Sequence, residues 1–409
     1  MTQKTLTSKT YPVFDGDSHV LEPAAIWDEY LEPEYRAPAR SVFWREEGDI
    51  RPVTILNGKN APEPFIPQDA AANIPRYGLW QPGMTDDDIA KLDPRVRHPV
   101  NPGGGDPTVR LRHMDAMGID QALLFPTHFA EYFPLVENPD IAEALARAYN
   151  NWILDFCKAA PDRLVPVAVL PVQEINACIR ELRRIAKLGF KGAFIRPVFV
   201  QGRFPHQPYY YPLWQELEEL GVMYCSHATH GTNAPELDAS APFVERVNGH
   251  LNIGHPVAEA IAPTMDQGAL LLGMMGEGLL EKYPNIKFYF AHSKASWVHL
   301  FLEKIESYLW LSIQADPVSL EPEKIFFNRN TLINFDTGES AIWEMPDLFE
   351  KSAVWGSFYP NHDTYTAWQG IESLETHGMS GEAIRKLMGS NLAKMLGVKP
   401  LLKIKEKSG

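Results

Sequence analysis

Aspartate and histidine residues stand directly after three separate apolar segments of this 409-residue chain. The first segment, Tyr11 to Phe14, leads into Asp17 and His19, and residues two apart in an extended strand project to the same side. His227 closes a second apolar segment and His292 closes a third. Carboxylate and imidazole ligands in this combination suit Zn²⁺, Mn²⁺ or Fe²⁺. The spacing therefore predicts that these four polar side chains converge on one divalent cation.

Three further polar residues lie near segment ends of the same kind. Asp15 precedes Asp17 by two residues, so it lies on the same face and is an alternative ligand. His230 follows His227 by three residues, and we interpret it as a candidate for substrate binding. Arg196 is a second such candidate, as a clamp for a carboxylate. The structural alternatives are a loop position for His230 and an ion pair at the rim of the fold for Arg196.

The segments that carry these residues alternate regularly with helical ones from about residue 106 onward. Leu164 to Pro171 is a short, nearly all-apolar strand, as expected when both faces of a sheet are covered. Asp106 and Pro107 indicate a helix start and Gly118 a stop, and the other strand candidates are likewise followed by helices. About eight strand–helix units in order predict a (β/α)₈ TIM barrel. In such barrels the C-terminal strand ends meet at one mouth, which brings the polar residues together.

Two long segments interrupt this alternation, at about residues 22–105 and 231–263. The first is rich in proline and shows little periodicity, and long irregular segments in compact domains usually have a functional role. We expect both to cover the C-terminal mouth of the barrel, within a single domain of residues 1–409. Four aromatic residues of the first segment are expected either to line an apolar pocket or to lie exposed on the cover: Phe43, Trp44, Tyr77 and Trp80.

Composition and charge exclude several classes of partner. The formal net charge is −14, so neither a nucleic acid backbone nor an anionic membrane surface is an expected partner. No stretch approaches about 20 uninterrupted apolar residues, and the N-terminus lacks the apolar core of a signal peptide. The three cysteines show no CxxC spacing, which favours a reducing compartment. These features predict a cytoplasmic protein that acts on a small molecule.

Several segments resemble a known family. FDGDSHVLEP at the first strand, GFKGAFIRP, LLEKYPNIKFYFAHS and the closing GSNLAKMLGV are similar to the second, amidohydrolase-related branch of the amidohydrolase superfamily. The resemblance extends over nearly the whole chain except the two interrupting segments. It implies a metal held by Asp17, His19, His227 and an aspartate after the eighth strand. It also implies that His292 orients the substrate or takes part in catalysis beside the metal.

The eighth strand departs from the family pattern. The family ending resembles GSDYPH, whereas this chain reads Gly-Ser-Phe-Tyr-Pro-Asn-His-Asp, with Phe358 at the position of the metal-binding aspartate. Phenylalanine can neither bind a metal nor move a proton. His362 or Asp363 is therefore a candidate substitute, and we treat Asp363 as a candidate catalytic residue. Two alternatives stay open: a metal with fewer protein ligands that supports a changed reaction, or a subunit without catalytic activity.

The resemblance implies a metal-dependent hydrolase or decarboxylase that acts on a small organic acid or amide. Zn²⁺ is the first choice of metal, with Mn²⁺ or Fe²⁺ as alternatives. A metal-dependent oxygenase on the same fold is one alternative function, and a non-catalytic metal-binding subunit is another. A homodimer is the expected assembly, and a hetero-oligomer with a homologous subunit is the alternative.

Overall fold

The computed structural model describes residues 8–46, 53–61, 78–93, 98–229, 260–308, 311 and 321–407. Eight parallel strands form its main sheet, and each pairs with the next of these eight along the chain. The strands are β1 (Phe14–His19), β5 (Gln121–Phe125), β6 (Leu164–Val169), β7 (Gly192–Ile195), β8 (Met223–His227), β9 (Phe288–Ala291), β10 (Thr331–Phe335) and β11 (Ala353–Trp355).

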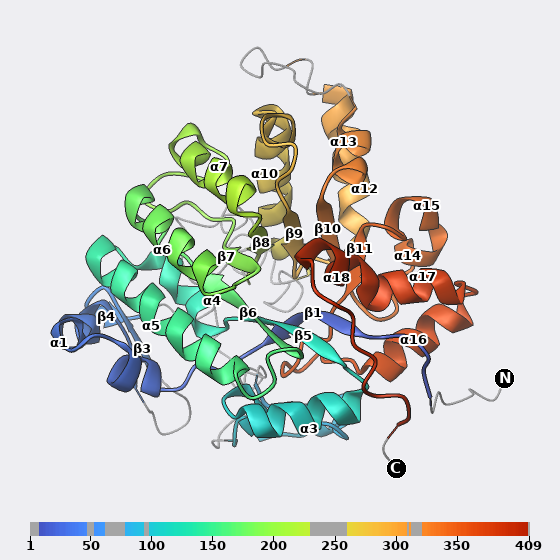
Figure 1. Ribbon diagram of the computed structural model, residues 1–409, viewed down its shortest axis with the longest axis horizontal. Coiled ribbons are helices and arrows are strands. Elements are labelled where there is room, and N and C mark those ends of the chain that lie inside the picture. The colour runs from blue at the N-terminus through green and yellow to red at the C-terminus, as the bar shows by residue number, and fades with distance from the viewer. Residues whose placement is uncertain are drawn as a thin grey trace.

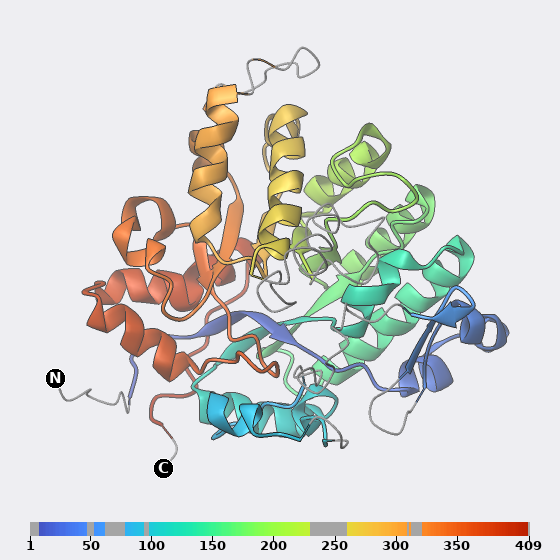
Figure 2. The same ribbon diagram turned by 180° about the vertical axis from the view of Figure 1, so that it is seen from behind.

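The sheet curls until its two edge strands meet. Beyond the end of β11, the amide of Phe358 donates to the carbonyl of Asp17 over 2.9 Å. The amide of His19 donates in return to the carbonyl of Tyr359 over 2.7 Å. These two bonds join the C-terminal end of β1 to the segment after β11. The predicted (β/α)₈ barrel is thus confirmed, with its strands at the centre and its helices around them (Figures 1 and 2).

Helices fill the connections between the strands and cover the barrel. They are α3 (Pro107–Met117), α4 (His128–Tyr132), α5 (Pro139–Cys157), α6 (Ile175–Lys187), α7 (Tyr211–Leu220), α10 (Ala262–Gly276), α11 (Leu279–Lys282), α12 (Ser296–Tyr308), α13 (Pro322–Asn328), α14 (Ala341–Glu344), α15 (Pro346–Phe349), α16 (Ala367–Thr376), α17 (Gly381–Arg385) and α18 (Asn391–Leu396). None of these helices is long and apolar enough to span a bilayer.

Helix α3 shows how the local sequence sets these boundaries. The Asp106 side chain accepts hydrogen bonds from the amides of Thr108 and Val109, which satisfies two of the free donors of the first turn. At the other end Gly118 has a φ of 80°, a left-handed conformation that favours glycine and ends the helix. The predicted start at Asp106 and stop at Gly118 are both confirmed.

The first interrupting segment contains more regular structure than its sequence predicted. It forms α1 (Pro33–Val42), the short helix α2 (Asp86–Ala90) and a three-stranded antiparallel sheet of β2 (Phe43–Glu46), β3 (Val53–Leu56) and β4 (Lys59–Asn60). Helix α1 and this sheet lie beside α5 at one side of the barrel (Figures 1 and 2). Most of the second interrupting segment lies outside the described residues.

The aromatic residues of the first segment pack as core rather than as a pocket lining. Phe43 lies 5.1 Å from Phe129 of α4 between ring centroids, and Trp80 lies 6.1 Å from Tyr359. Phe43, Trp44 and Trp80 are all buried, and none of them lines the main cavity that the described residues form. Tyr77 lies outside the described residues. Apolar burial therefore fixes the segment to the barrel wall.

Candidate metal centre

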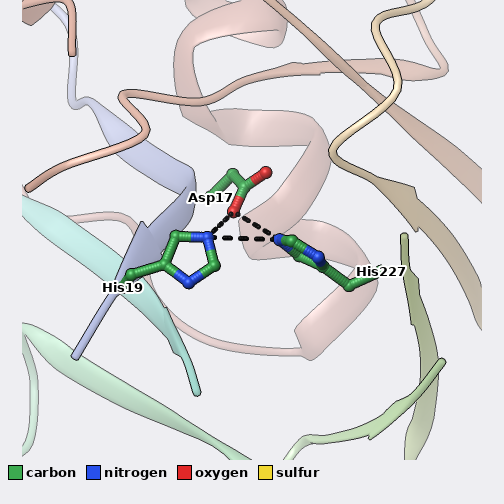
Figure 3. Close-up of side chains that lie close together, drawn as sticks. All are labelled: Asp17, His19 and His227. Carbon is green, nitrogen blue, oxygen red and sulfur yellow. Dashed lines mark hydrogen bonds and ion pairs between the residues drawn. The ribbon is translucent and has the colours of Figure 1, made fainter. Parts of the chain in front are cut away.

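Asp17, His19 and His227 point toward one another at the C-terminal ends of β1 and β8 (Figure 3). The Asp17 Oδ1 atom lies 3.2 Å from His19 Nε2 and 3.3 Å from His227 Nε2, and the two Nε2 atoms are 3.2 Å apart. Such separations match those between ligand atoms that share one ion at bond lengths of about 2.1 Å. All three side chains are buried. The structure therefore brings the three predicted metal ligands together.

Backbone carbonyls orient both imidazoles of this cluster. The Nδ1 atom of His19 lies 3.0 Å from the carbonyl oxygen of Pro126, and that of His227 lies 2.7 Å from the carbonyl oxygen of Ala228. Because a carbonyl only accepts hydrogen bonds, each Nδ1 carries the proton. The Nε2 atom of each ring therefore faces Asp17 and is the atom available to a metal, as in histidines that bind metals.

The Asp17 carboxylate is a buried anion that calls for a cation. Apart from the two imidazoles, no N–H or O–H group in the described part of the chain donates a hydrogen bond to its oxygens. Buried carboxylates without donors are rare, because burying an uncompensated charge is costly. A divalent cation bound by the cluster would compensate this charge, because it fits the donor set of one carboxylate and two imidazoles.

The electrostatics of the cluster favour the metal-binding protonation states of Asp17 and His227. Burial alone would raise the pKa of Asp17, but the neighbouring His227 and His19 hold it below its usual range. Burial lowers the pKa of His227, so its ring is neutral near pH 7. The pKa of His19 is raised, because the adjacent Asp17 carboxylate outweighs the effect of burial. An ionised carboxylate and unprotonated Nε2 atoms are the forms that bind a metal, and a bound cation would replace the proton on His19.

Asp15, the alternative ligand, has a different role. Its carboxylate accepts hydrogen bonds from the Ser357 amide over 2.8 Å and from the Ser357 hydroxyl. It also accepts from the Asp17 amide over 3.1 Å. Asp15 therefore links β1 to the segment that carries Phe358, and Asp17 alone of the two faces the histidines.

Arg110 of α3 contacts the C-terminal end of β1, a structural role that the sequence did not predict. Its buried guanidinium donates to the Gly103 carbonyl and the Ser18 hydroxyl, both over 2.8 Å, and to the His19 carbonyl. The group also lies over the Tyr359 ring, 4.3 Å from its centroid. A single arginine therefore contacts both Ser18 and His19 at the end of β1.

His292 and Phe358 form the next layer around the cluster. The His292 ring stacks on His227 at 4.9 Å with an interplanar angle of 7°, and the Phe358 ring lies 4.7 Å from His292. His292, Lys294 and Phe358 have φ values of 55°, 60° and 61°, in a left-handed region that non-glycine residues rarely adopt. Such strain gathers at functional sites. An aromatic ring thus stands near the cluster where the family resemblance implied a carboxylate.

A cavity of about 360 Å³ opens beside the cluster. His19, His227 and His292 line it, so the Nε2 atoms of the cluster lie next to open space. The Thr229 hydroxyl also lines the cavity and is buried without a hydrogen-bond partner among the described residues. Much of the remaining wall is apolar and consists of Pro126, Ala130, Ala228, Pro263, Trp297 and Phe358. Ligand sites commonly combine such an apolar wall with a few polar groups.

The other predicted site residues lie in different positions. Asp363 lines the cavity, but its side chain is 49% exposed and it is not part of the metal-ligand cluster. Arg196 is buried at the end of β7 and borders a separate small hollow. Its Nη1 donates to the carbonyl of Glu131 over 2.7 Å, so it supports a residue of the main cavity. His230 lies outside the described residues.

Glu131 is a cavity residue that was not predicted from the sequence. It lies on α4, directly after β5, and is only 5% exposed while lining the cavity with His19 and His227. Burial raises its pKa to about 7. The only signal in the sequence is a carboxylate inside the apolar run HFAEYF after the second strand.

Comparisons with known proteins agree with this fold. The family model described as amidohydrolase matches residues 96–398. A γ-resorcylate decarboxylase of Rhizobium sp. (strain MTP-10005) is 28% identical over 194 residues, 45% of this chain and 54% of that protein. A 2-amino-3-carboxymuconate-6-semialdehyde decarboxylase of Dictyostelium discoideum is 25% identical over 210 residues, 50% of this chain and 53% of that protein. The chain spans about half the length of the curated relatives it matches.

Solved structures share the fold at low sequence identity. An amidohydrolase from Mycobacterium avium subsp. paratuberculosis K-10 superposes with a TM-score of 0.74 at 18% identity and covers 95% of this chain and 100% of that one. A dihydroxybenzoic acid decarboxylase from Polaromonas sp. JS666, with bound manganese and the inhibitor 2-nitroresorcinol, gives a TM-score of 0.60 at 16% identity. Its match covers 95% of this chain and 97% of that one. Identities this low establish the barrel fold alone.

Proposed function

The chain belongs to the amidohydrolase family, and from this premise we propose that it is a metal-dependent decarboxylase of a small unsaturated or aromatic carboxylic acid. The observation that carries the proposal is the convergence of Asp17, His19 and His227 beside a largely apolar cavity. The decarboxylases among its curated relatives favour loss of CO₂ over hydrolysis. A lyase of the amidohydrolase type is therefore the first candidate.

Asp17, His19 and His227 would hold the divalent ion, for which we propose Zn²⁺ first and Mn²⁺ or Fe²⁺ as alternatives. The manganese in one solved relative makes Mn²⁺ a strong second choice. When bound there, such an ion would supply Lewis-acid chemistry that withdraws negative charge from substrate oxygens.

The protein's own side chains would position the substrate. Trp297 and Phe358 offer aromatic faces to a planar acid, and with the other apolar residues of the wall they exclude water. The Thr229 hydroxyl, buried without a partner among the described residues, is available to a polar substituent. His292 lines the cavity next to His227 and is placed to bind a substrate oxygen. The cavity volume of about 360 Å³ suits a single-ring acid.

A substrate panel tests this proposal directly. The purified protein is loaded in turn with Zn²⁺, Mn²⁺ and Fe²⁺ and offered hydroxybenzoates and unsaturated aliphatic acids, with CO₂ release as the readout. We expect turnover of at least one acid with one metal, and loss of that turnover in Asp17→Ala. Absence of CO₂ from every acid with every metal would contradict a decarboxylase.

A second candidate function is oxygen activation. Phe358 stands near the cluster, where a fourth protein ligand is implied, which leaves two histidines and one carboxylate. That set with open positions is typical of non-haem Fe²⁺ oxygenases. Substrate-dependent oxygen uptake by the Fe²⁺-loaded protein would favour this function, whereas amide hydrolysis with Zn²⁺ would favour a hydrolase. Inactivity until a homologous chain is added would indicate a non-catalytic subunit.

We also propose a homodimer in the cytoplasm. Leu272 of α10 and Leu300 of α12 are each 53% exposed, and exposed apolar side chains on adjacent helices favour a contact with another protein surface. The three cysteines are free and buried, in keeping with a reducing compartment. Light scattering after gel filtration distinguishes a dimer from a monomer, and mixing with a homologous chain tests for a hetero-oligomer.

A further inference from the structure

Three carboxyl groups of the described residues line the cavity, and their surroundings differ. Asp336, after β10, lies 3.6 Å from the ammonium group of Lys294, so it has a cationic partner. Asp363 has a half-exposed side chain close to His362. Glu131 is buried, and no described residue donates a hydrogen bond to its carboxyl group. Of the three, Glu131 is the carboxyl that is both shielded from water and without a partner among the described residues.

The position of Glu131 is rigidly defined. It lies on α4, and the amides at the start of this helix, those of Thr127, His128 and Phe129, donate to the buried Glu22 carboxylate over 3.0 Å. Arg196 holds the carbonyl of Glu131 itself over 2.7 Å. These contacts come from the β1 end and the β7 end of the barrel. They fix the backbone of Glu131 and leave its carboxyl group free to face the cavity.

We propose that Glu131 is the proton donor of the decarboxylation, in place of the aspartate that the family resemblance implies at position 358. This inference rests on the proposed function. The bond between the substrate carbon and its carboxylate breaks, and its electron pair stays on that carbon while CO₂ leaves. The Glu131 carboxylic acid then gives its proton to the carbon, which forms the new C–H bond. The resulting Glu131 carboxylate takes up a proton from solvent before the next turnover.

The charges around Glu131 keep this proton available near neutral pH. Burial raises the pKa of Glu131 to about 7, and the charge of Glu22 acts in the same direction. The charges of Arg196, Arg45 and His19 oppose the rise. A general acid is most effective when its pKa lies near the working pH. The rate should therefore be constant below about pH 7 and fall at higher pH, as Glu131 loses its proton.

The decisive experiment compares wild type with Glu131→Gln, Glu131→Asp and the exposed control Glu137→Gln, on an acid that wild type decarboxylates. Glutamine has the shape of the neutral acid but no proton to give. We expect Glu131→Gln to lose about 10²- to 10⁴-fold in kcat, while Glu137→Gln keeps wild-type activity. In Glu131→Gln, the metal content, measured by metal analysis, and the affinity for the product, measured by calorimetry, should stay unchanged. Wild type should also exchange the new C–H hydrogen of the product in D₂O, and Glu131→Gln should not.

A spectroscopic measurement adds a readout independent of turnover. Infrared difference spectra between pH 6 and 8 should show a protonated carboxyl band in wild type that is weaker by one carboxyl group in Glu131→Gln, while Asp15 and Asp336, whose pKa values burial also raises to about 7, account for the rest of the band. If wild type is active and Glu131→Gln retains kcat within threefold, Glu131 is not the donor although the decarboxylase function stands. If wild type releases CO₂ from no acid, the proposed function itself fails, and the role of Glu131 fails with it.

Discussion

Two carboxyl groups of β1 lie two residues apart and face different partners. Asp15 accepts three hydrogen bonds from protein groups, whereas the Asp17 oxygens face two imidazoles and accept no hydrogen bond from any other group of the described residues. A register irregularity in the pairing of β1 with β5, between Asp15 and Ser18, accompanies this difference. Sequence spacing alone left the choice between the two open.

Substitution of each carboxyl tests this division. Asp17→Asn should lose stoichiometric metal, because an amide is a poor ligand for the ion and cannot neutralise its charge. Asp15→Asn should keep it, because burial raises the pKa of Asp15 to about 7 and the asparagine amide resembles its neutral form. Metal analysis after dialysis measures both. Full metal content in Asp17→Asn would remove Asp17 from the ligand set.

Glu131 should lower the folding stability of the protein at neutral and higher pH, in addition to its proposed role as proton donor. Its pKa rises from 4.5 to about 7 on folding, so its contribution to stability is present below pH 4.5 and is lost as the pH rises through 7. At about 1.4 kcal/mol for each pKa unit, the loss is limited to about 3 kcal/mol. Glu131→Gln should therefore unfold at higher denaturant concentration than wild type at pH 8, and the difference should shrink toward pH 5. A difference that does not vary with pH would show that Glu131 titrates normally.

The convergence of Asp17, His19 and His227 could be predicted because their types and their positions at strand ends are both visible in the sequence. Arg110 and Glu131 could not, because their roles depend on what surrounds them in the fold. Arg110 lies in a helix of ordinary composition, and two of its three acceptors belong to a distant strand of the barrel. Nothing in a single sequence marks an arginine as buried or a glutamate as facing a cavity.

At the scale of elements, the segment after β11 determines what kind of site the barrel forms. Its backbone is held to β1 by the bond from Phe358 to the Asp17 carbonyl and by the contacts of Ser357 with Asp15. The segment therefore presents residue 358 to His292 whatever that side chain is. The φ of 61° at this position strains a phenylalanine more than an aspartate, because aspartate enters the left-handed region more readily.

Phe358→Asp should accordingly restore a fourth ligand on a backbone that accepts it. We expect metal loss to a chelator at least about tenfold slower than in wild type, since one more protein ligand must dissociate. Phe358→Leu is the matched control, because it removes the ring without adding a ligand. A gain of amide hydrolysis in the aspartate variant would show that the scaffold is otherwise competent. Equal rates of metal loss in the two variants would mean that residue 358 lies out of reach of the ion.

The elements of the barrel were predictable and those of the first interrupting segment were not, for a physical reason. A strand buried on both faces must be apolar throughout, so a run such as Leu164 to Val169 can be recognised as a strand from the sequence. The strands β2 to β4 are too short to show a clear alternation of apolar and polar residues. Helix α1 begins with Pro33 and contains Pro38, and prolines at these positions argue against a helix when only the sequence is known. Helix α1 is held by its contacts with α5, which sequence patterns do not show.

At the scale of the whole molecule, the proposed metal ligands lie on strands that are not neighbours in the sheet. Asp17 and His19 belong to β1 and His227 to β8, and three strands separate β1 from β8 in the sheet order. Without a cation, only the proton on His19 balances the buried charge of Asp17, and His227 of β8 is neutral near pH 7. A bound ion would therefore act as a cross-link through the centre of the barrel mouth.

This cross-link makes the stability of the barrel depend on metal concentration. A ligand that binds only the folded state adds about 1.4 kcal/mol for each tenfold excess over its dissociation constant. The melting temperature of wild type, measured by calorimetry, should fall on chelation and rise again with the logarithm of added metal. Asp17→Asn should melt at one temperature at all metal concentrations, because it lacks the anionic ligand that joins β1 to the histidine of β8. A metal response in that variant equal to wild type would place the stabilising ion elsewhere in the molecule and separate it from the cluster on β1 and β8.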